Sequence, residues 1–212
     1  MEENRAEKRA RFMEDYQTYR ARRNKKVLAG VGIVIALGIA VFMYLNKPYE
    51  SEKGGNYNIG RTENYEGKKM EMKDTPMVIN NGKAYISLDT LKKEKILYTE
   101  YRGEKRKYFM KLDYLPLMAY ISPAGRVVLT TSICEPCTGT KFSIEGKELV
   151  CKACGTRWRL NDLMGLMGGC VRFAPEEIKY TVENNQLVID EALLKNWQPR
   201  VYSDEMVNST NS

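Results

Sequence analysis

The cysteine pattern constrains this chain more than any other feature. Its five cysteines follow the pattern C-x2-C-x13-C-x2-C-x15-C, and the 212 residues contain no histidine. Two C-x-x-C pairs bring soft thiolate ligands together from two short loops, as zinc and iron sites require. The spacing therefore predicts a metal centre formed by Cys134, Cys137, Cys151 and Cys154. Cys170 is expected to be a further ligand, a spare that lets a cluster form, or a free thiol.

The absence of histidine excludes several kinds of site. A Rieske centre and a blue-copper site need imidazole ligands, and c-type haem attachment needs a C-x-x-C-H sequence. Neither a Ser-His-Asp triad nor a Cys-His pair is possible. General acid and base catalysis would fall to Asp, Glu, Lys or Tyr, and no spacing of these residues stands out. The sequence favours an electron-transfer or metal-binding protein over an enzyme.

An apolar segment near the N-terminus predicts a membrane anchor. Residues 27–45 are uncharged and almost wholly apolar, and as a helix they would extend about 28 Å, close to the hydrocarbon thickness of a bilayer. Five basic residues lie within 20–26, whereas Lys47 and Lys53 are the only bases shortly after the segment. The positive-inside rule then predicts a cytoplasmic N-terminus and a C-terminal domain outside the cytoplasm.

Two export signals compete with this interpretation. A cleaved signal peptide would have a shorter apolar region and a small-x-small cleavage site after Leu45, which the sequence lacks. Arg22 and Arg23 resemble half of a twin-arginine signal, but their flanking residues fit it poorly. An uncleaved anchor with a basic flank is the preferred hypothesis.

Composition divides the chain into five parts. Residues 1–26 carry nine basic and five acidic side chains, so this stub holds much of the net charge of +7, and nothing supports nucleic-acid binding. Residues 46–74 are polar and rich in glycine, which is typical of a flexible linker. The predicted organisation is a cytoplasmic basic stub (1–26), a transmembrane helix (27–45), a linker (46–74), a folded metal domain (75–199) and a polar tail (200–212).

Short strands separated by turn residues predict a mainly β fold, with a small antiparallel β domain that carries the two C-x-x-C knuckles. Residues 160–169 are expected to form a helical turn or loop that delivers Cys170. Gly155 is expected to let the second knuckle turn back and direct amide N–H groups at sulfur, and Trp158 to cover one side of the site. The predicted hairpins pair 77–79 with 84–86, 96–101 with 107–112, 117–121 with 126–131, 141–144 with 148–150, and 178–182 with 187–189.

From about Ala84 to Trp197 the chain resembles the FtrD-like iron–sulfur membrane proteins. The resemblance rests on 108–111, on the strand 126–131, and on three cysteine motifs, Cys-Glu-Pro-Cys at 134–137, Glu-Leu-Val-Cys-Lys-Ala-Cys-Gly at 148–155 and Met-Gly-Gly-Cys at 167–170. It implies an extracytoplasmic iron–sulfur or iron centre with the five cysteines as candidate ligands. It also implies a role in iron uptake or membrane electron transfer beside a redox or iron-permease partner. The family continues Gly-Gly-Cys with Asn-Pro-Ile-Pro, whereas Val-Arg-Phe-Ala-Pro follows Cys170 here.

Other uses of the cysteines remain open. The spacing of the two knuckles alone favours a structural zinc ribbon, in an interaction module anchored to the membrane, whereas the resemblance and the fifth cysteine favour iron. A disulfide or a thiol redox pair suits an oxidising compartment, but the number of cysteines is odd and no thioredoxin-like pattern surrounds them. Copper is a further soft-ligand option, with Met164 and Met167 near Cys170.

Overall fold

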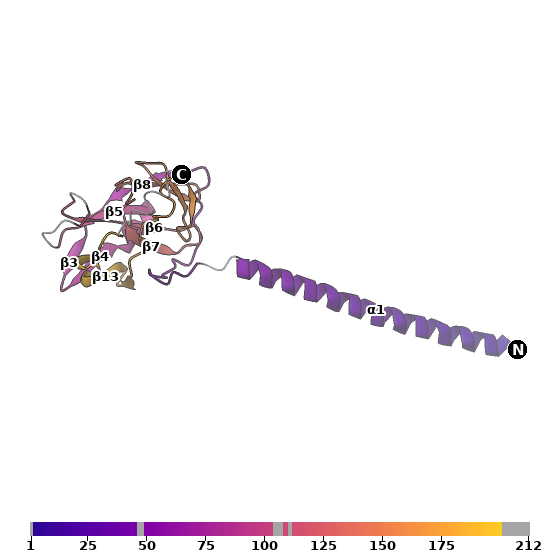
Figure 1. Ribbon diagram of the computed structural model, residues 1–212. Coiled ribbons are helices and arrows are strands. Elements are labelled where there is room, and N and C mark those ends of the chain that lie inside the picture. Colours follow the sequence, from indigo (N-terminus) through magenta and orange to yellow (C-terminus); the bar gives the residue numbers. More distant parts are fainter. Residues whose placement is uncertain (1, 46–48, 104–107, 110–111, 201–212) are drawn as a thin grey trace. The chain divides into compact units, whose positions relative to one another are not determined.

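The computed structural model describes residues 2–45, 49–103, 108–109 and 112–200. The chain forms two compact units, Met1–Lys47 and Pro48–Ser212. The described residues of the second unit form thirteen strands in three sheets and two short helices, so the prediction of a mainly β fold with one long apolar N-terminal helix is confirmed. Figure 1 shows its strands gathered into one body.

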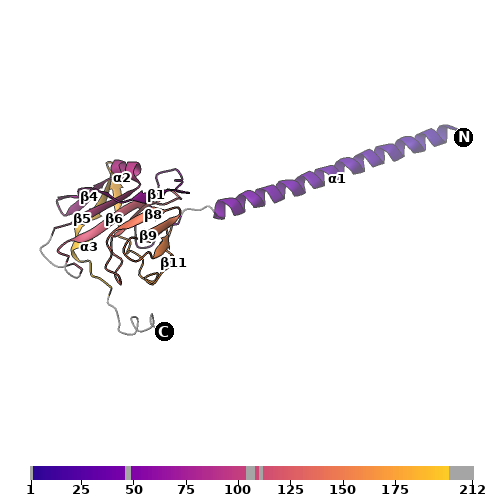
Figure 2. The same cartoon turned by 90° about the horizontal axis from the view of Figure 1, so that it is seen from above.

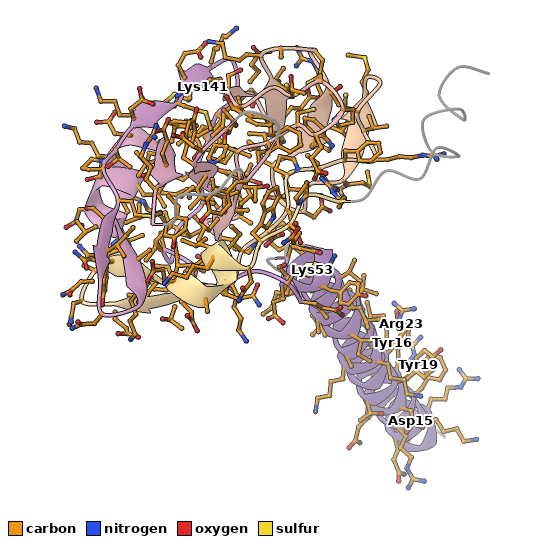
Figure 3. The ribbon with its side chains drawn as sticks, turned by 60° about the vertical axis from the view of Figure 1, so that its left-hand side comes forward. Asp15, Tyr16, Tyr19, Arg23, Lys53 and Lys141 are labelled. Carbon is orange, nitrogen blue, oxygen red and sulfur yellow. The ribbon has the colours of Figure 1, made fainter. Side chains whose placement is uncertain are left out.

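The first unit is a single helix, α1 (Glu2–Leu45), which includes the predicted anchor and the basic stub. It is long and apolar enough to cross a membrane, and none of the apolar window is covered by protein. The labelled Tyr16, Tyr19 and Arg23 project outward from the helix (Figure 3). The large apolar side chains of this helix between Val27 and Tyr44 are more than half exposed, which in water would be unfavourable. One N-terminal candidate span is therefore present.

The central sheet of the second unit has an apolar core on each face. Its order is β2 (Lys73–Asp74), β5 (Ile96–Tyr101), β6 (Leu115–Ile121) and β7 (Val127–Thr131), with β2 parallel to β5 and the other pairs antiparallel. Every residue of β6 is buried. Because alternate side chains of a strand point to opposite faces, Leu117 and Ala119 enter one core, whereas Met118 and Tyr120 enter the other.

The first core lies between the central sheet and a second sheet. That sheet has the order β12 (Thr181–Glu183), β13 (Gln186–Asp190), β4 (Lys83–Ser87) and β3 (Val78–Asn80). Two short helices, α2 (Leu88–Glu94) and α3 (Glu191–Lys195), add Leu91 and Leu194 to this core. Asn81 and Gly82 both have positive φ, as the tight turn between β3 and β4 requires. The predicted β3–β4 and β12–β13 hairpins are confirmed.

The second core lies under the sheet that carries the cysteines. Its order is β1 (Lys69–Glu71), β8 (Phe142–Glu145), β9 (Glu148–Cys151), β10 (Arg157–Arg159) and β11 (Gly165–Met167), all antiparallel. Figure 2 shows β8, β9 and β11 together on one side of the unit. Three cysteines, Cys134, Cys151 and Cys170, belong to this core, and Cys137 packs against it. The metal knuckles are thus built into an apolar layer.

One predicted hairpin pairs differently from expectation, and residues 160–169 take the loop form of the two that were expected. β5 pairs with β6, with Tyr101 opposite Leu115, and not with 107–112. Within that expected strand, Tyr108 donates its backbone N–H to Leu112, while 107 and 110–111 lie outside the described residues. Residues 160–169 form a loop and the edge strand β11, because glycines at 165, 168 and 169 disfavour a helix. The predicted 117–121/126–131 and 141–144/148–150 hairpins are confirmed.

Much of the stretch expected to be a linker is folded against the sheets. It supplies β1 and β2, and the hydroxyl of buried Tyr65 donates to the carbonyl of Ile121 at 2.8 Å. Arg126, only 1% exposed, donates to the carbonyl of Gly55 at 3.3 Å and pairs with Glu177 at 2.9 Å. The sequence did not predict that this stretch is folded, because it contributes few apolar side chains and is held mainly by backbone and side-chain hydrogen bonds.

Candidate metal centre

The first knuckle connects β7 to β8 and is closed by backbone hydrogen bonds. The N–H of Cys134 donates to the carbonyl of Gly139 at 2.8 Å, and the N–H of Thr138 donates to Glu135 at 3.3 Å. A Cβ on Gly139 would lie 2.9 Å from the sulfur of Cys151 and 3.3 Å from the sulfur of Cys137. Glycine at 139 therefore lets the backbone of one knuckle approach the sulfurs of both.

The second knuckle begins at the last residue of β9. The N–H of Cys151 donates to Thr156 at 2.9 Å, and the N–H of Gly155, at a φ of 72°, donates to the carbonyl of Cys151 at 2.8 Å. Gly155 thus turns the loop back as predicted, but its amide bonds a carbonyl. The amides that face the Cys151 sulfur belong to Ala153 and Cys154.

Hydrogen bonds to Thr156 hold Cys170 beside the second knuckle. The Thr156 hydroxyl oxygen accepts hydrogen bonds from the backbone N–H of Cys170 and from the thiol of Cys154, both at 3.2 Å. A Cβ on Gly168 would lie 2.5 Å from that hydroxyl, whereas one on Gly169 would meet nothing within 4 Å. The close approach expected for the Gly-Gly lead-in is therefore a property of Gly168, and Gly169 borders open space.

The five sulfurs gather in one cluster, and the structure shows all five cysteines as free thiols. The Sγ atoms of Cys134, Cys137, Cys154 and Cys170 all lie within 4.8 Å of one another. Cys134 and Cys154 are 3.9 Å apart, as are Cys154 and Cys170. Cys151 stands outside this four-sulfur group, although its sulfur lies 3.7 Å from that of Cys137. Cys170 is thus a member of the central group.

This donor set fits a single tetrahedral ion. A metal bound by four thiolates at about 2.3 Å places its sulfurs about 3.8 Å apart, from tetrahedral geometry. Two separations within the four-sulfur group, Cys134–Cys154 and Cys154–Cys170, are both 3.9 Å and come close to that edge, whereas the 3.7 Å separation joins Cys137 to Cys151 outside the group. A cluster with bridging sulfides would hold its cysteines farther apart, because the metals and sulfides lie between them. A single ion would draw the more widely separated sulfurs of this group, which lie within 4.8 Å of one another, toward that edge length.

The thiols of the cluster differ in their pKa. A hydrogen bond from the Cys134 thiol, together with nearby backbone amides, lowers the pKa of Cys151 to about 5. The same hydrogen bond raises the pKa of Cys134. Burial raises the pKa of Cys137 to about 12. A cation at the centre would replace these shared protons, since metal-bound cysteine is a thiolate.

Apolar and aromatic side chains surround the sulfurs on the inner side. Trp158 is fully buried in the same core as three of the cysteines, lies against Phe142, and donates its indole N–H to the carbonyl of Val171 at 3.1 Å. Cys154 is exposed, so the cluster has one solvent-facing edge. Met164, raised above as a copper ligand, has its sulfur 3.6 Å from the guanidinium of Arg159, an unfavourable position for a cation.

Besides Gly139 and Thr156, a third residue of the site was not predicted from the sequence. Arg200 donates from its Nε to the carboxylate of Glu135 at 2.6 Å, and from its Nη2 to the carbonyl of Ala174 at 2.9 Å. Its guanidinium also lies 5.5 Å from the ring centre of Phe173. Arg200 thereby connects the first knuckle to the loop after Cys170. Glu135 was the available signal in the sequence, because a charged residue between the two cysteines of a buried knuckle needs a partner of opposite charge.

Comparison with known proteins shows to which family the chain belongs. The family described as membrane iron-sulfur containing protein FtrD-like matches residues 91–201, which include all five cysteines and Arg200. The chain belongs to this FtrD-like family. No curated protein and no solved structure matches. The expected resemblance is confirmed, and the FtrD-like segment covers the central sheet from β5 onward, both knuckles and the Cys170 loop. The ligand set itself remains a prediction.

Proposed function

We propose that this FtrD-like chain is a membrane-anchored electron carrier with an iron centre on its cysteine cluster. The observation that carries the proposal is the group of four sulfurs within 4.8 Å of one another, which the spare thiol of Cys151 adjoins. When bound there, iron supplies a one-electron redox couple. The family name, which describes an iron-sulfur containing membrane protein, supports iron over other soft metals.

The exposure of the cluster supports electron transfer. Cys154 is exposed while Cys134 and Cys151 are fully buried, so one edge of the centre faces solvent and the rest lies in an apolar layer. Burial of the other sulfurs limits solvent access and helps to set the redox potential. An electron carrier needs both properties, because its partner must approach the centre closely and water must not reach it freely.

The anchor supports a location at the membrane surface. The five bases of residues 20–26 precede the apolar stretch of α1, and the positive-inside rule assigns this end to the cytoplasm. The cysteine domain then lies on the outer side. There its partner would be a membrane redox protein or an iron permease, in iron uptake or another membrane electron-transfer process.

A structural zinc site is the second candidate, favoured by one specific observation. The two 3.9 Å separations within the four-sulfur group suit any single tetrahedral ion, zinc included. In that case the domain would be an interaction module whose metal only stabilises the fold. Cys154 exposure and the fifth thiol would then have no function, since a structural zinc site closes with four ligands.

The two candidates separate on purified full-length protein. The chain, produced with ample iron and isolated in detergent without oxygen, should contain iron and show visible sulfur-to-iron charge-transfer absorbance that bleaches reversibly on reduction. Acid-labile sulfide distinguishes a cluster from the mononuclear site that the sulfur spacing favours. A colourless, zinc-loaded protein from such a preparation would contradict the electron-carrier proposal and support the zinc alternative.

A further inference from the structure

The cluster offers one thiol more than a tetrahedral ion binds. Three sulfurs are common to both possible sets of four ligands, those of Cys134, Cys137 and Cys154. Cys170 completes a four-sulfur group with them. Cys151 lies 3.7 Å from Cys137 and also interacts with the thiols of Cys134 and Cys154. Two fourth ligands are therefore available for the same three sulfurs.

The two alternative ligands differ in their access to solvent. Cys151 is fully buried at the end of β9, and its sulfur lies against Gly139. Cys170 is 7% exposed, follows the open Gly169, and has the exposed Cys154 3.9 Å away. An ion that arrives from solvent meets the exposed Cys154 and the half-buried Cys137 first, and of the two alternative fourth ligands Cys170 is the more accessible.

Thr156 holds the outer pair of ligands in place. Its buried hydroxyl oxygen accepts from the Cys154 thiol and from the backbone N–H of Cys170, both at 3.2 Å. The two cysteines come from different loops, and this shared oxygen is a direct hydrogen-bonded link between them. The outer pair is therefore positioned by a side chain that is not itself a metal ligand.

Building on the proposed function, we infer that the ion enters at an outer site formed by Cys134, Cys137, Cys154 and Cys170, and then exchanges Cys170 for the buried Cys151. In the exchange one metal–sulfur bond, to Cys170, breaks and one, to Cys151, forms. Cys151 enters the coordination sphere as a thiolate and Cys170 leaves it as a thiolate, so the charge on the centre is unchanged and no electron moves. Cys170 is the loading ligand and Cys151 the retaining ligand of one centre.

Cobalt(II) uptake by the full-length chain tests this inference. The reduced, metal-free protein in detergent micelles is mixed with Co²⁺, and thiolate-to-cobalt charge-transfer absorbance is followed in time. The final intensity reports the number of bound thiolates, and transfer of Co²⁺ to a chelator reports retention. The variants are Cys170→Ser, Cys151→Ser and the double variant, with Met167→Ala, an exposed neighbour that contributes no thiol, as the matched control.

The inference predicts a different defect for each single variant. Cys170→Ser should reach the four-sulfur intensity of the wild type but take up the ion on the order of 10-fold more slowly. Cys151→Ser should load at the wild-type rate with the same intensity, and lose Co²⁺ to the chelator on the order of 10-fold faster. The double variant should reach only a three-sulfur intensity, and Met167→Ala should behave as wild type.

A second pair of variants keeps all five cysteines. Thr156→Val removes the shared acceptor while it preserves side-chain shape, and should slow loading as Cys170→Ser does, without changing final intensity. Thr156→Ser retains the hydroxyl and should load normally. Circular dichroism of each metal-free variant checks that the sheets remain, so a loading defect in Thr156→Val alone still tests the inference if a cysteine variant fails to fold.

The outcomes that overturn the inference are distinct from failure of the proposed function. A three-sulfur intensity in Cys170→Ser or in Cys151→Ser would make that cysteine a permanent ligand and exclude exchange. Wild-type loading in Cys170→Ser would remove Cys170 from the entry path. By contrast, a wild-type chain that binds no Co²⁺ would contradict the metal centre itself, and a zinc-loaded native protein would contradict only the electron-carrier role.

Discussion

The guanidinium of Arg200 binds the buried carboxylate of Glu135, with 2.6 Å between Nε and Oε1. The backbone N–H of Arg200 donates to the same carboxylate at 3.0 Å. Glu135 lies between the two cysteines of the first knuckle and its side chain is 1% exposed, whereas that of Arg200 is 37% exposed. The last described residue of the chain thus fixes the first metal-binding loop, so Arg200 packs with the cysteine domain.

Arg200→Gln should destabilise the cysteine domain. The change leaves the buried Glu135 carboxylate without this charged donor, which costs about 1–3 kcal/mol in the free energy of unfolding. Arg102→Gln is the matched control, because Arg102 forms an exposed ion pair with Glu100, and such pairs contribute about 0–1 kcal/mol. Denaturant unfolding of both variants measures the difference. Equal stabilities would show that the Glu135–Arg200 pair does not support the knuckle.

Two glycines of the cysteine loops, Gly139 and Gly169, should respond differently to a methyl group. Gly139→Ala places a Cβ 2.9 Å from the sulfur of Cys151 and 2.8 Å from the Cβ of Ala153, so the knuckles must separate and metal content should fall. Gly169→Ala meets no atom within 4 Å and should retain its metal. Metal-to-protein ratios after identical purification make the comparison. Full metal content in Gly139→Ala would mean that the loops do not pack as described.

Residues 49–74 should be needed for folding. A chain that begins at Tyr49 keeps the Gly55–Arg126 hydrogen bond, Tyr65 and strand β1, whereas one that begins at Thr75 loses all of them. Loss of the fully buried Tyr65 side chain alone removes about 2–3 kcal/mol of apolar burial. The longer chain should show a cooperative thermal transition and dispersed NMR signals. A fully folded chain from Thr75 would restore the interpretation of 46–74 as a linker.

The orientation of α1 can be tested in intact cells. Because the basic residues precede the apolar stretch, the cysteine domain should lie outside the cytoplasm. Protease added to spheroplasts should therefore digest the domain and leave an N-terminal fragment that contains residues 1–45. A domain that resists protease until the membrane is opened would reverse the orientation, and a mature chain that starts after residue 45 would exclude the anchor.

Patterns local in the sequence predicted most of the hairpins. Turn residues such as Asn81 and Gly82, and Gly146 between β8 and β9, require positive φ and mark the turn directly. The cysteine spacing located the centre for the same reason, since each knuckle is a short local loop. The β5–β6 pairing was missed because its strands are separated by a long loop, and the nearer segment 107–112 is rich in aromatic and apolar residues.

Contacts between distant residues could not be predicted. Nothing in the sequence near Arg126 reveals that Gly55, Asn161 and Glu177 all meet its guanidinium. Likewise Cys170 belongs to the group of four sulfurs within 4.8 Å of one another and Cys151 does not, although the C-x-x-C spacing favours Cys151. The position of Cys170 depends on its hydrogen bond to Thr156 and on the close approach of Gly168 to the same residue, and both are tertiary contacts.

The most direct test of the account is the metal in full-length protein purified without oxygen from iron-replete cells. The account predicts about one iron per chain for a mononuclear four-thiolate site, visible charge-transfer absorbance, and a paramagnetic ferric signal that disappears on one-electron reduction. Cys154→Ser, which removes the exposed shared ligand, should lose the iron and the absorbance together. Stoichiometric zinc with no visible absorbance, unchanged by iron supply, would contradict the electron-carrier claim.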